Sequence, residues 1–388
     1  MMYDFGQVLK IPTVIMRGGT SKGLILRKYD LPANAVLRDQ LILRMFGSPD
    51  SSQIDGLGGG TSLTSKLALV GPPSRNGAHI DYTFGQVSLD KSYIDYNVTC
   101  GNLITAVGLY AAEEGYVPLT EPITKVHIYN TNIDKIVIAE IPVSNGQIVY
   151  DGDFSIDGVP GQSARIMLNF LNSGGTFTGK TLPTGNVVDR VKLKEGSEFD
   201  VSIVDCTNTV VFIQSEELGL LGTELQEDIN QNLPLLETLE KIRVATGNMI
   251  GLISPNETIT PTSHALPKIC MVSSKKSYIT NTGKSVEDHE IDILSRYISM
   301  GVLHRTHAVS GALSLATACQ IPGTIPNLLT ASTGPGLRIG HPAGVLYVES
   351  LVEKVDDGWF VARAANGRTA RRLMEGFAYI PVTALKAN

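Results

Sequence analysis

Apolar residues in the first half of the chain follow two spacings, one typical of strands and one typical of helices. Short or alternating apolar runs predict strands, and the helical spacing of apolar residues from Val36 to Met45 predicts a helix. This mixture favours a fold that combines sheets with helices. The predicted strands are 11–16, 24–26, 67–70, 79–88, 93–98, 125–129 and 135–141, and the predicted helices are 33–46 and 103–112.

The second half of the chain repeats landmarks of the first. Cys100-Gly101-Asn102-Leu103 aligns on its glycine with Ser310-Gly311-Ala312-Leu313, and an alanine lies five residues past each glycine. Landmarks in matching order indicate two similar halves from one duplicated unit, rather than chance similarity. The other matching landmarks are 14–20 with 201–207, 33–46 with 224–246, and 66–70 with 268–272.

A polar stretch over 154–188 separates the two halves. It is rich in Gly, Ser, Thr, Asn and Pro, which favour loops. We therefore expect two domains, 1–184 and 185–388, with the final strands free to return to the first domain. Within the second half, Pro234 either interrupts a long helix or separates two shorter ones. A strand over Trp359–Ala364 and a basic turn at 368–372 are expected to close the chain.

Composition excludes several classes of protein. A length of 388 residues suggests two domains, and a net charge of −6 does not favour nucleic acid or an anionic membrane surface as a partner. The longest apolar run is about half of a membrane span of ~20 residues, and the N-terminus does not resemble a signal peptide. The four cysteines are scattered, which suits reduced thiols. We expect a cytoplasmic protein.

Cys100 is the first candidate for chemistry. It lies between a predicted strand and a predicted helix, and Gly101 lets the backbone bend directly after it. Unpaired N–H groups and the helix dipole at such a position favour a thiolate and attract a carboxylate or enolate. The alternative is a small buried side chain, the usual environment of a free cysteine. The second copy around Ser310 favours the functional interpretation.

A loop rich in glycine, hydroxyls and cations follows the first predicted strand. Arg17-Gly18-Gly19-Thr20-Ser21-Lys22-Gly23 suits an anion site, although a polar turn between two strands is the alternative. The residue order is not that of a P-loop. The glycines at 56–60 precede a strand, which argues against a dinucleotide fingerprint, and we expect this loop to bring Thr61, Ser62 and Lys66 to a cleft.

Lysines and histidines supply the remaining candidates. Lys66 and its duplicate Lys268 each open an apolar strand, where a surface lysine at a strand edge is the alternative. His304 and His307 lie three residues apart before Ser310, but further ligands at metal-binding spacing are missing, so we expect no metal.

Five stretches together resemble the PrpF-type isomerases, a family that includes methylaconitate isomerase, methylitaconate Δ-isomerase and oxalomesaconate tautomerase. The resemblance implies an α+β fold like that of diaminopimelate epimerase, with two similar domains related by a pseudo-two-fold. In that fold each domain is a mixed sheet curled around a central helix, and the site lies between the domains. The matching stretches are 16–23, 64–66, Cys100-Gly101-Asn102, His304-Arg305 with 309–312, and Arg338-Ile339-Gly340-His341-Pro342.

The resemblance also implies roles for particular residues. Lys66 and Cys100 match the proposed acid–base pair of the family, while Ser310 stands where diaminopimelate epimerase has its second thiol. A serine cannot exchange protons as a thiol does, so a double-bond shift is favoured over stereoinversion by two thiols. The expected substrate-binding residues are Arg17, Gly19, Thr20, Ser21, Lys22, Thr61, Ser62, Gly101, Asn102, Lys268, Arg305, Ser310, Gly311 and His341.

The expected activity is proton transfer on a small unsaturated di- or tricarboxylate, without a cofactor. Which of Lys66 and Cys100 is the base stays open, as does the choice between a monomer and a homodimer. Two alternative functions also stay open. One is a racemase or epimerase of an amino or hydroxy acid, and the other is a non-catalytic carboxylate-binding accessory protein.

Overall fold

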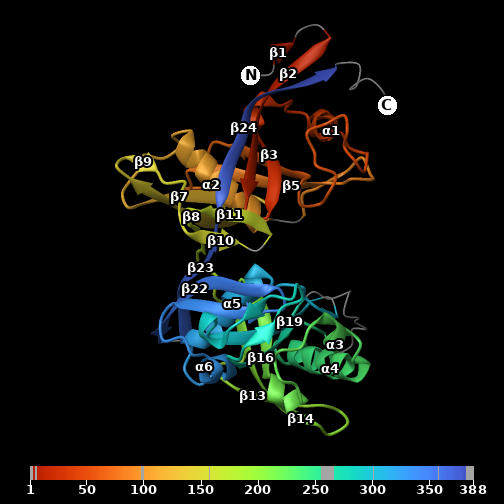
Figure 1. Cartoon of the computed structure of the whole chain (residues 1–388), viewed down its shortest axis with the longest axis vertical. Helices are drawn as coiled ribbons and strands as arrows, with labels where there is room; N and C mark the ends of the chain where they lie inside the picture. Colours follow the sequence, from red (N-terminus) through yellow and green to blue (C-terminus); the bar gives the residue numbers. More distant parts are fainter. Residues whose placement is uncertain are drawn as a thin grey trace. The chain divides into compact units, whose positions relative to one another are not determined.

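The computed structural model describes residues 3–4, 7–97, 100–156, 158–254, 266–299, 301–356 and 358–381. The chain divides into two compact units (Figure 1). The first unit comprises Met1–Asn169 together with Gly367–Asn388, and the second comprises Phe170–Asn366. The last strand of the chain therefore belongs to the same unit as the first.

The first unit contains the central helix α2 (Gly101–Glu113), the outer helix α1 (Ala35–Phe46) and a 3-10 turn at Lys28–Asp30. Asn34 caps α1 by accepting a hydrogen bond from the Leu37 N–H, and Gly47 ends the helix in the left-handed conformation. The strands are β1 (Tyr3–Asp4), β2 (Val8–Gly18), β3 (Ser21–Arg27), β4 (Lys66–Gly71), β5 (Ile80–Val87), β6 (Ile94–Asp95), β7 (Ile123–Asn130), β8 (Lys135–Ser144), β9 (Gln147–Ile148), β10 (Phe154–Ile156), β11 (Val159–Ser163), β12 (Ile166–Phe170) and β24 (Ala370–Pro381).

The second unit contains the central helix α5 (Val309–Gln320), together with α3 (Gln226–Asn230), α4 (Leu233–Met249) and α6 (Ile325–Leu329). Its 3-10 turns are Ser215–Leu218 and Asp288–Glu290. The strands are β13 (Asp189–Lys192), β14 (Glu198–Cys206), β15 (Asn208–Gln214), β16 (Lys268–Ser274), β17 (Tyr278–Ile279), β18 (Ser285–Val286), β19 (Ile293–Ser299), β20 (Val302–Leu303), β21 (Gly336–His341), β22 (Gly344–Val355) and β23 (Gly358–Arg368).

Strand pairing follows the same sequence of parallel and antiparallel steps in both units. In the first unit the order is β24–β2–β3–β4–β5–β7–β8, with β3–β4 and β5–β7 parallel and the other steps antiparallel. In the second the order is β13–β14–β15–β16–β19–β21–β22–β23, with β15–β16 and β19–β21 parallel. The steps from β2 to β8 thus repeat from β14 to β22, as expected for a duplicated unit.

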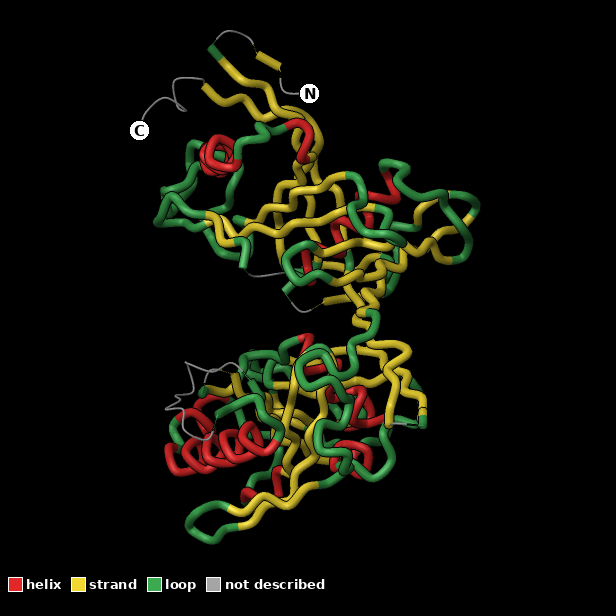
Figure 2. Tube along the Cα trace, turned by 180° about the vertical axis from the view of Figure 1, so that it is seen from behind, coloured by secondary structure: helices red, strands yellow, loops and turns green. Residues whose placement is uncertain are grey.

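Each central helix lies among strands, as the red turns within the yellow strands of Figure 2 show. Every residue of α2 from Leu103 to Ala112 is buried, and the helix contacts β2, β3, β4, β5, β7, β8 and β24. In α5 the buried residues run from Gly311 to Cys319, and the helix contacts β14, β15, β21 and β22. A helix that is apolar on all sides must be covered on all sides, which explains this position.

The two units divide between Asn169 and Phe170, earlier in the chain than the domain boundary expected at 184/185. The polar stretch that suggested a linker is held by the second unit. Gly174 pairs with Cys206, and the Thr181 carbonyl accepts a hydrogen bond from the Asp205 N–H. Leu182 is buried in the hydrophobic core around α5.

Three local predictions also change. The basic turn expected at 368–372 is instead the end of β23 at Arg368 and the start of β24, which pairs with β2 along its whole length (Figure 1). The strand expected at 93–98 is limited to β6, and Val98 lies outside the described residues. The helix expected at 224–246 is two helices, α3 and α4, with Pro234 in the first turn of α4. Within the described ranges, every helix is too short or too polar to cross a lipid bilayer.

A substitution of Gly108 tests the packing of the central helix. A Cβ built at Gly108 would lie 2.3 Å from the Cβ of Ala139 on β8. Gly108→Val should therefore lower the free energy of unfolding by about 1–3 kcal/mol, the usual cost of overpacking a core. Urea denaturation followed by circular dichroism measures this change. Gly334→Val is the control, because a Cβ at Gly334 meets open space. Equal stability of the Gly108 variant and the wild type would contradict the close packing.

Candidate functional site

Cys100 lies at the N-terminus of α2, where it is the N-cap residue in an extended conformation. No side chain caps this end of the helix. The Cys100 carbonyl accepts the Ile104 N–H at 3.2 Å and the Tyr82 hydroxyl at 3.4 Å, so the backbone of the residue is held from two sides. The thiol is left at a helix end whose free N–H groups and dipole favour a negative charge.

Exposure distinguishes Cys100 from the other three cysteines. Cys100 is partly exposed, whereas Cys206, Cys270 and Cys319 are buried. Burial raises the pKa of Cys206 to about 11 and that of Cys270 to about 12, and it also raises the pKa of Cys319. These three thiols are therefore protonated at neutral pH and closed to solvent, which leaves Cys100 as the thiol that a ligand can reach.

Lys66 is the first residue of β4 and is held by the neighbouring strand β5. Its Nζ donates to Gln86 Oε1 at 3.0 Å and lies 5.2 Å from the centre of the Phe84 ring. Gln86 Nε2 in turn donates to the carbonyls of Ser62 and Ser65, so the amide is fixed in the orientation that receives the lysine. The ammonium thus has a defined position without an acidic partner in the part of the chain that the structure describes.

Lys66 and Cys100 belong to the same unit and lie near the same end of α2. Gly23 on β3 packs against both the start of β4 and the first turn of α2. A Cβ built at Gly23 would lie 2.4 Å from the Lys66 carbonyl oxygen and 3.1 Å from Leu103 Cδ1. No hydrogen bond joins the Lys66 ammonium to the Cys100 sulfur among the described residues. The arrangement leaves both groups free to act on a ligand rather than on each other.

The stretch predicted as an anion site is a tight hairpin turn between β2 and β3, in which Gly18 pairs with Ser21. Two of its backbone donors are already used, because the Gly19 N–H donates to the Thr369 carbonyl and the Lys22 N–H to the Leu63 carbonyl. The stretch is therefore a turn between two strands, and its role as an anion site stays a prediction.

Arg17 is also occupied by internal hydrogen bonds. Its Nη1 donates to the Gly19 carbonyl at 3.0 Å, and to the carbonyl and hydroxyl of Thr369 at 3.1 and 2.9 Å. Burial, and then the nearby Arg371, lower the pKa of Arg17. Arg17 therefore fixes β24 against the hairpin turn, and most of its donor capacity on that side is not available to a substrate. Lys22 is half-buried, while Thr61 and Ser62 are exposed, with the Thr61 hydroxyl 2.8 Å from that of Thr64.

Asn102 connects the hairpin turn to the helix that carries Cys100. Its Nδ2 donates to Thr20 Oγ1 at 3.0 Å and to Ser21 Oγ at 3.4 Å, and its Oδ1 accepts from Arg368 Nε at 3.1 Å. Gly101, between Asn102 and Cys100, has open space where a Cβ would be. Thr20, Ser21 and Arg368 are thus joined to Asn102, which lies two positions after Cys100.

The second unit places Lys268 as the first unit places Lys66. Lys268 opens β16 and donates from Nζ to Ser299 Oγ at 3.3 Å. Ser299 stands opposite Lys268 on β19 just as Gln86 stands opposite Lys66 on β5. Burial, and then the nearby Arg243, lower the pKa of Lys268.

Ser310 lies in the first turn of α5, two residues past the N-cap Ala308. Its hydroxyl accepts a hydrogen bond from Asn208 Nδ2 at 3.3 Å, and its carbonyl accepts one from the Thr207 hydroxyl. Gly311 allows the Tyr297 ring to approach the helix, since a Cβ there would lie 2.4 Å from the ring. The hairpin turn between β14 and β15 therefore contacts α5 much as the turn between β2 and β3 contacts α2.

Two histidines of the second unit, His307 and His341, are buried and neutral at pH 7. His307 and His341 are each 4% exposed. Burial lowers the pKa of His307 to about 4 and that of His341 to about 3. His307 Nε2 has no hydrogen-bond partner among the residues that the structure describes. His341 would therefore act as a neutral hydrogen-bonding group.

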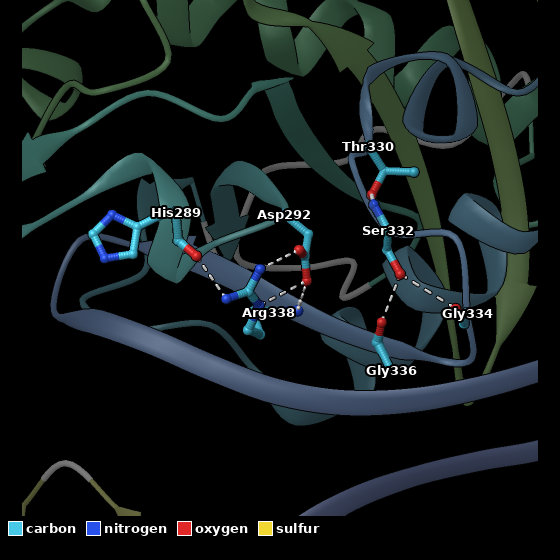
Figure 3. Close-up of polar contacts among 7 residues, drawn as sticks. All are labelled: His289, Asp292, Thr330, Ser332, Gly334, Gly336 and Arg338. Carbon is cyan, nitrogen blue, oxygen red and sulfur yellow. Dashed lines mark hydrogen bonds and ion pairs between the residues drawn. The ribbon is translucent and has the colours of Figure 1, made fainter.

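Two arginines of the second unit differ in their surroundings. Arg338 lies on β21 with its guanidinium on both oxygens of Asp292, at 2.7 and 3.2 Å, and on the His289 carbonyl (Figure 3). Arg338 is therefore occupied by a structural ion pair. Arg305 is exposed and forms no ion pair with any described residue. Across the described ranges, no group of three or more His, Cys, Asp or Glu side chains could hold a metal ion.

Sequence reasoning missed two residues near the site, Gln86 and Arg368. Gln86 holds the Lys66 ammonium, and Arg368 reaches Asn102 although the two lie 266 positions apart in the chain. A strand register for β4 and β5 could have identified Gln86. For Arg368, the sequence offered only a cluster of basic residues near the C-terminus.

The buried histidines predict a pH-dependent stability. An unfolded histidine titrates near ~6.5, so below that pH the unfolded chain binds protons that folded His307 and His341 do not bind until about pH 4 and 3. The free energy of unfolding should therefore fall as the pH is lowered from ~6.5, by up to ~1.4 kcal/mol per pH unit for each residue. Urea denaturation at several pH values between about 7 and 5 gives the free energy of unfolding as a function of pH. This free energy should fall less steeply with decreasing pH in His341→Gln than in the wild type. His289→Gln is the control, because His289 is exposed. The same pH dependence in His341→Gln as in the wild type would contradict a neutral, buried His341.

Comparison with known proteins places the chain in a family. The family model described as PrpF protein matches residues 8–381. The 3-methylitaconate isomerase of Eubacterium barkeri is 45% identical over 375 residues, which cover 96% of this chain and 97% of the relative. The 2-methyl-aconitate isomerase of Shewanella oneidensis is 38% identical over 391 residues, which cover 97% and 98%.

A solved structure supports the same assignment. The crystal structure of a methylitaconate-delta-isomerase matches with a TM-score of 0.92 at 44% identity, covering 99% of this chain and 98% of that chain. The mixed α and β fold expected from the sequence is thereby confirmed. The chain belongs to the PrpF family, as its motifs predicted.

Proposed function

We propose that this protein is a cofactor-independent isomerase that moves a double bond by proton transfer in a small unsaturated di- or tricarboxylate. Lys66 and Cys100 are the proposed acid–base pair. The observation that carries the proposal is the position of Cys100, a partly exposed thiol at the uncapped N-terminus of the central helix. A positioned lysine lies near the same helix end, held by Gln86.

The proposed reaction needs one base, one acid and a place for developing negative charge. The base removes an allylic proton next to a carboxylate, which gives a dienolate, and the conjugate acid returns a proton at the far carbon. Free N–H groups at the start of α2 stabilise the charge on the carboxylate oxygens. The base of the forward reaction is the acid of the reverse reaction, so both roles belong to the pair.

The substrate is proposed from the relatives. Methylitaconate and 2-methylaconitate, named for two relatives, have an allylic C–H next to a carboxylate, and oxalomesaconate, named for a third, has one next to a ketone. An allylic C–H acidified by a neighbouring carbonyl group is the feature that this chemistry needs. The proposed layout is that of two diaminopimelate epimerase-like copies, in line with the repeated strand pairing. A homodimer stays a prediction.

Racemisation by two thiols is a weaker candidate. It requires a second group able to exchange protons at the start of α5, where Ser310 stands. A serine hydroxyl is a poor acid and base without an activating partner, and the contacts of Ser310 are with Asn208 and Thr207. The presence of both Lys66 and Cys100 argues against a binding protein without activity.

Removal of either proposed acid–base group should abolish most activity. Cys100→Ser and Lys66→Met should each lower kcat by at least about a hundredfold, the lower range for a positioned acid–base group. Steady-state kinetics measures the change. Cys319→Ala is the matched control, because it removes a buried thiol from the second unit. Activity close to wild type in Cys100→Ser would remove this residue from the mechanism.

Proton exchange identifies the substrate and the reaction together. In deuterated buffer, the enzyme should place deuterium at one carbon of the isomerised product, because the returning proton comes from a group in contact with solvent. An NMR screen with methylitaconate, 2-methylaconitate, aconitate isomers and oxalomesaconate measures this incorporation. Loss of optical rotation in a racemase substrate without movement of a double bond would favour the alternative instead. Binding of all these carboxylates without exchange would indicate an accessory protein.

A further inference from the structure

Arg368 is a partly buried cation beside the proposed catalytic thiol. It is the last residue of β23 and belongs to the first unit. Its Nε donates to Asn102 Oδ1 at 3.1 Å, and its Nη1 donates to the Gly367 carbonyl at 2.9 Å. Asn102 is the second residue of α2 and follows Cys100 by two positions. Arg368 is therefore tied to the first turn of the helix that Cys100 begins.

We propose that Arg368 binds a carboxylate of the substrate next to Cys100, with Asn102 holding the guanidinium in place. This inference rests on the proposed function, because it assumes that the ligand of the Cys100 site is a carboxylate. It names a binding residue that the sequence motifs did not suggest, and a chemical group that this residue recognises.

The first argument is the missing counter-charge. Among the described residues, no carboxylate forms an ion pair with Arg368, whereas Arg372 contacts Glu113, Glu114 and Glu375, and Arg338 contacts Asp292. Burial lowers the pKa of Arg368 to about 10, although the nearby Cys100 raises it, and the side chain is still charged at neutral pH. A desolvated cation is normally paired, and a carboxylate ligand would supply that partner.

The second argument is the number and direction of free donors. A guanidinium has five N–H groups, of which Asn102 and Gly367 receive two. The other three have no partner in the described parts of the chain. A planar fork with neighbouring free N–H groups matches the two oxygens of a carboxylate, and such charge-assisted pairs are among the stronger hydrogen bonds.

The third argument is that the surrounding residues fix Arg368. Asn102 is oriented by the Thr20 and Ser21 hydroxyls, which receive its Nδ2. Gly19 makes room for this arrangement, since a Cβ there would lie 2.1 Å from Asn102 Oδ1 and 3.2 Å from Arg368 Cδ. Gly19 also has a φ of +49°, which favours glycine. The hairpin turn expected to bind an anion through its own groups therefore positions an arginine.

Protection of Cys100 from alkylation tests this without requiring turnover. Propane-1,2,3-tricarboxylate is saturated, so it cannot be isomerised, but it presents the expected carboxylates. It should slow the reaction of Cys100 with iodoacetamide in the wild type. In Arg368→Gln the half-protecting concentration should rise at least about tenfold, the effect of losing a hydrogen-bonded charge. Each protein is compared with its own unprotected rate, and modification is located by mass spectrometry.

Two further variants separate binding from a purely structural role. Arg371→Gln is the matched control, because it removes an exposed arginine three positions away. Its half-protecting concentration of propane-1,2,3-tricarboxylate should equal that of the wild type. Arg368→Lys keeps the positive charge but lacks the planar guanidinium. Its half-protecting concentration should lie between those of the wild type and Arg368→Gln, and its melting temperature should be close to that of the wild type. The corresponding triamide lacks carboxylates, so it should not slow the alkylation of Cys100 in the wild type or in any variant.

The outcomes are distinct. An unchanged half-protecting concentration in both Arg368 variants, or no protection of the wild type, would overturn the role of Arg368. Protection that depends on Arg368 would support it even if no substrate in the NMR screen were converted. Failure of the isomerase proposal is thus recognised separately, by the absence of deuterium incorporation. Once a substrate is identified, KM should rise more than kcat falls in Arg368→Lys.

Discussion

The candidate site depends on one close contact, between the hairpin turn of β2–β3 and the first turn of α2. A Cβ at Gly18 would lie 2.1 Å from the Asn102 carbonyl oxygen, so only glycine permits the backbone of the turn to touch the helix here. The contact fixes the start of α2 against the sheet. It thereby fixes Cys100 on the helix relative to Lys66, which pairs in register with Gly23 on the adjoining strand.

Much of the fold could be predicted because its signals are local. Apolar residues on every side of 103–112 indicate a buried helix, and the glycine after Cys100 and after Ser310 marks the same point in both copies. The order of strands also follows from short apolar runs. The domain boundary could not be predicted in this way, since the polar residues near Leu182 resemble a linker but are held by hydrogen bonds to Asp205.

The polar contacts of the site could be predicted only in part. Residue type and spacing suggested Asn102, Thr20 and Ser21, but not that Arg17 is occupied by Thr369, which is 352 positions away. The same long-range pairing of β24 with β2 brings Arg368 to the site. A sequence pattern can show that a loop has cations, whereas only the folded chain shows which of them have already found a partner.

The two copies share one member of the proposed acid–base pair and differ in the other. Lys66 and Lys268 each open a strand and donate to the polar residue opposite, Gln86 or Ser299. At the helix start, however, the first copy has a partly exposed thiol and the second has Ser310, whose hydroxyl accepts a hydrogen bond from Asn208.

Only the first copy therefore combines an amine with a thiol, the two groups of the proposed acid–base pair. The second copy has neutral, buried histidines and a hydroxyl at the equivalent place, which are groups suited to hydrogen bonding. Inversion of a stereocentre from opposite faces needs two such exchanging groups at matched positions of the two copies. A double-bond shift needs only one base and one acid in a single copy, and this is the chemistry that the asymmetry between the copies favours.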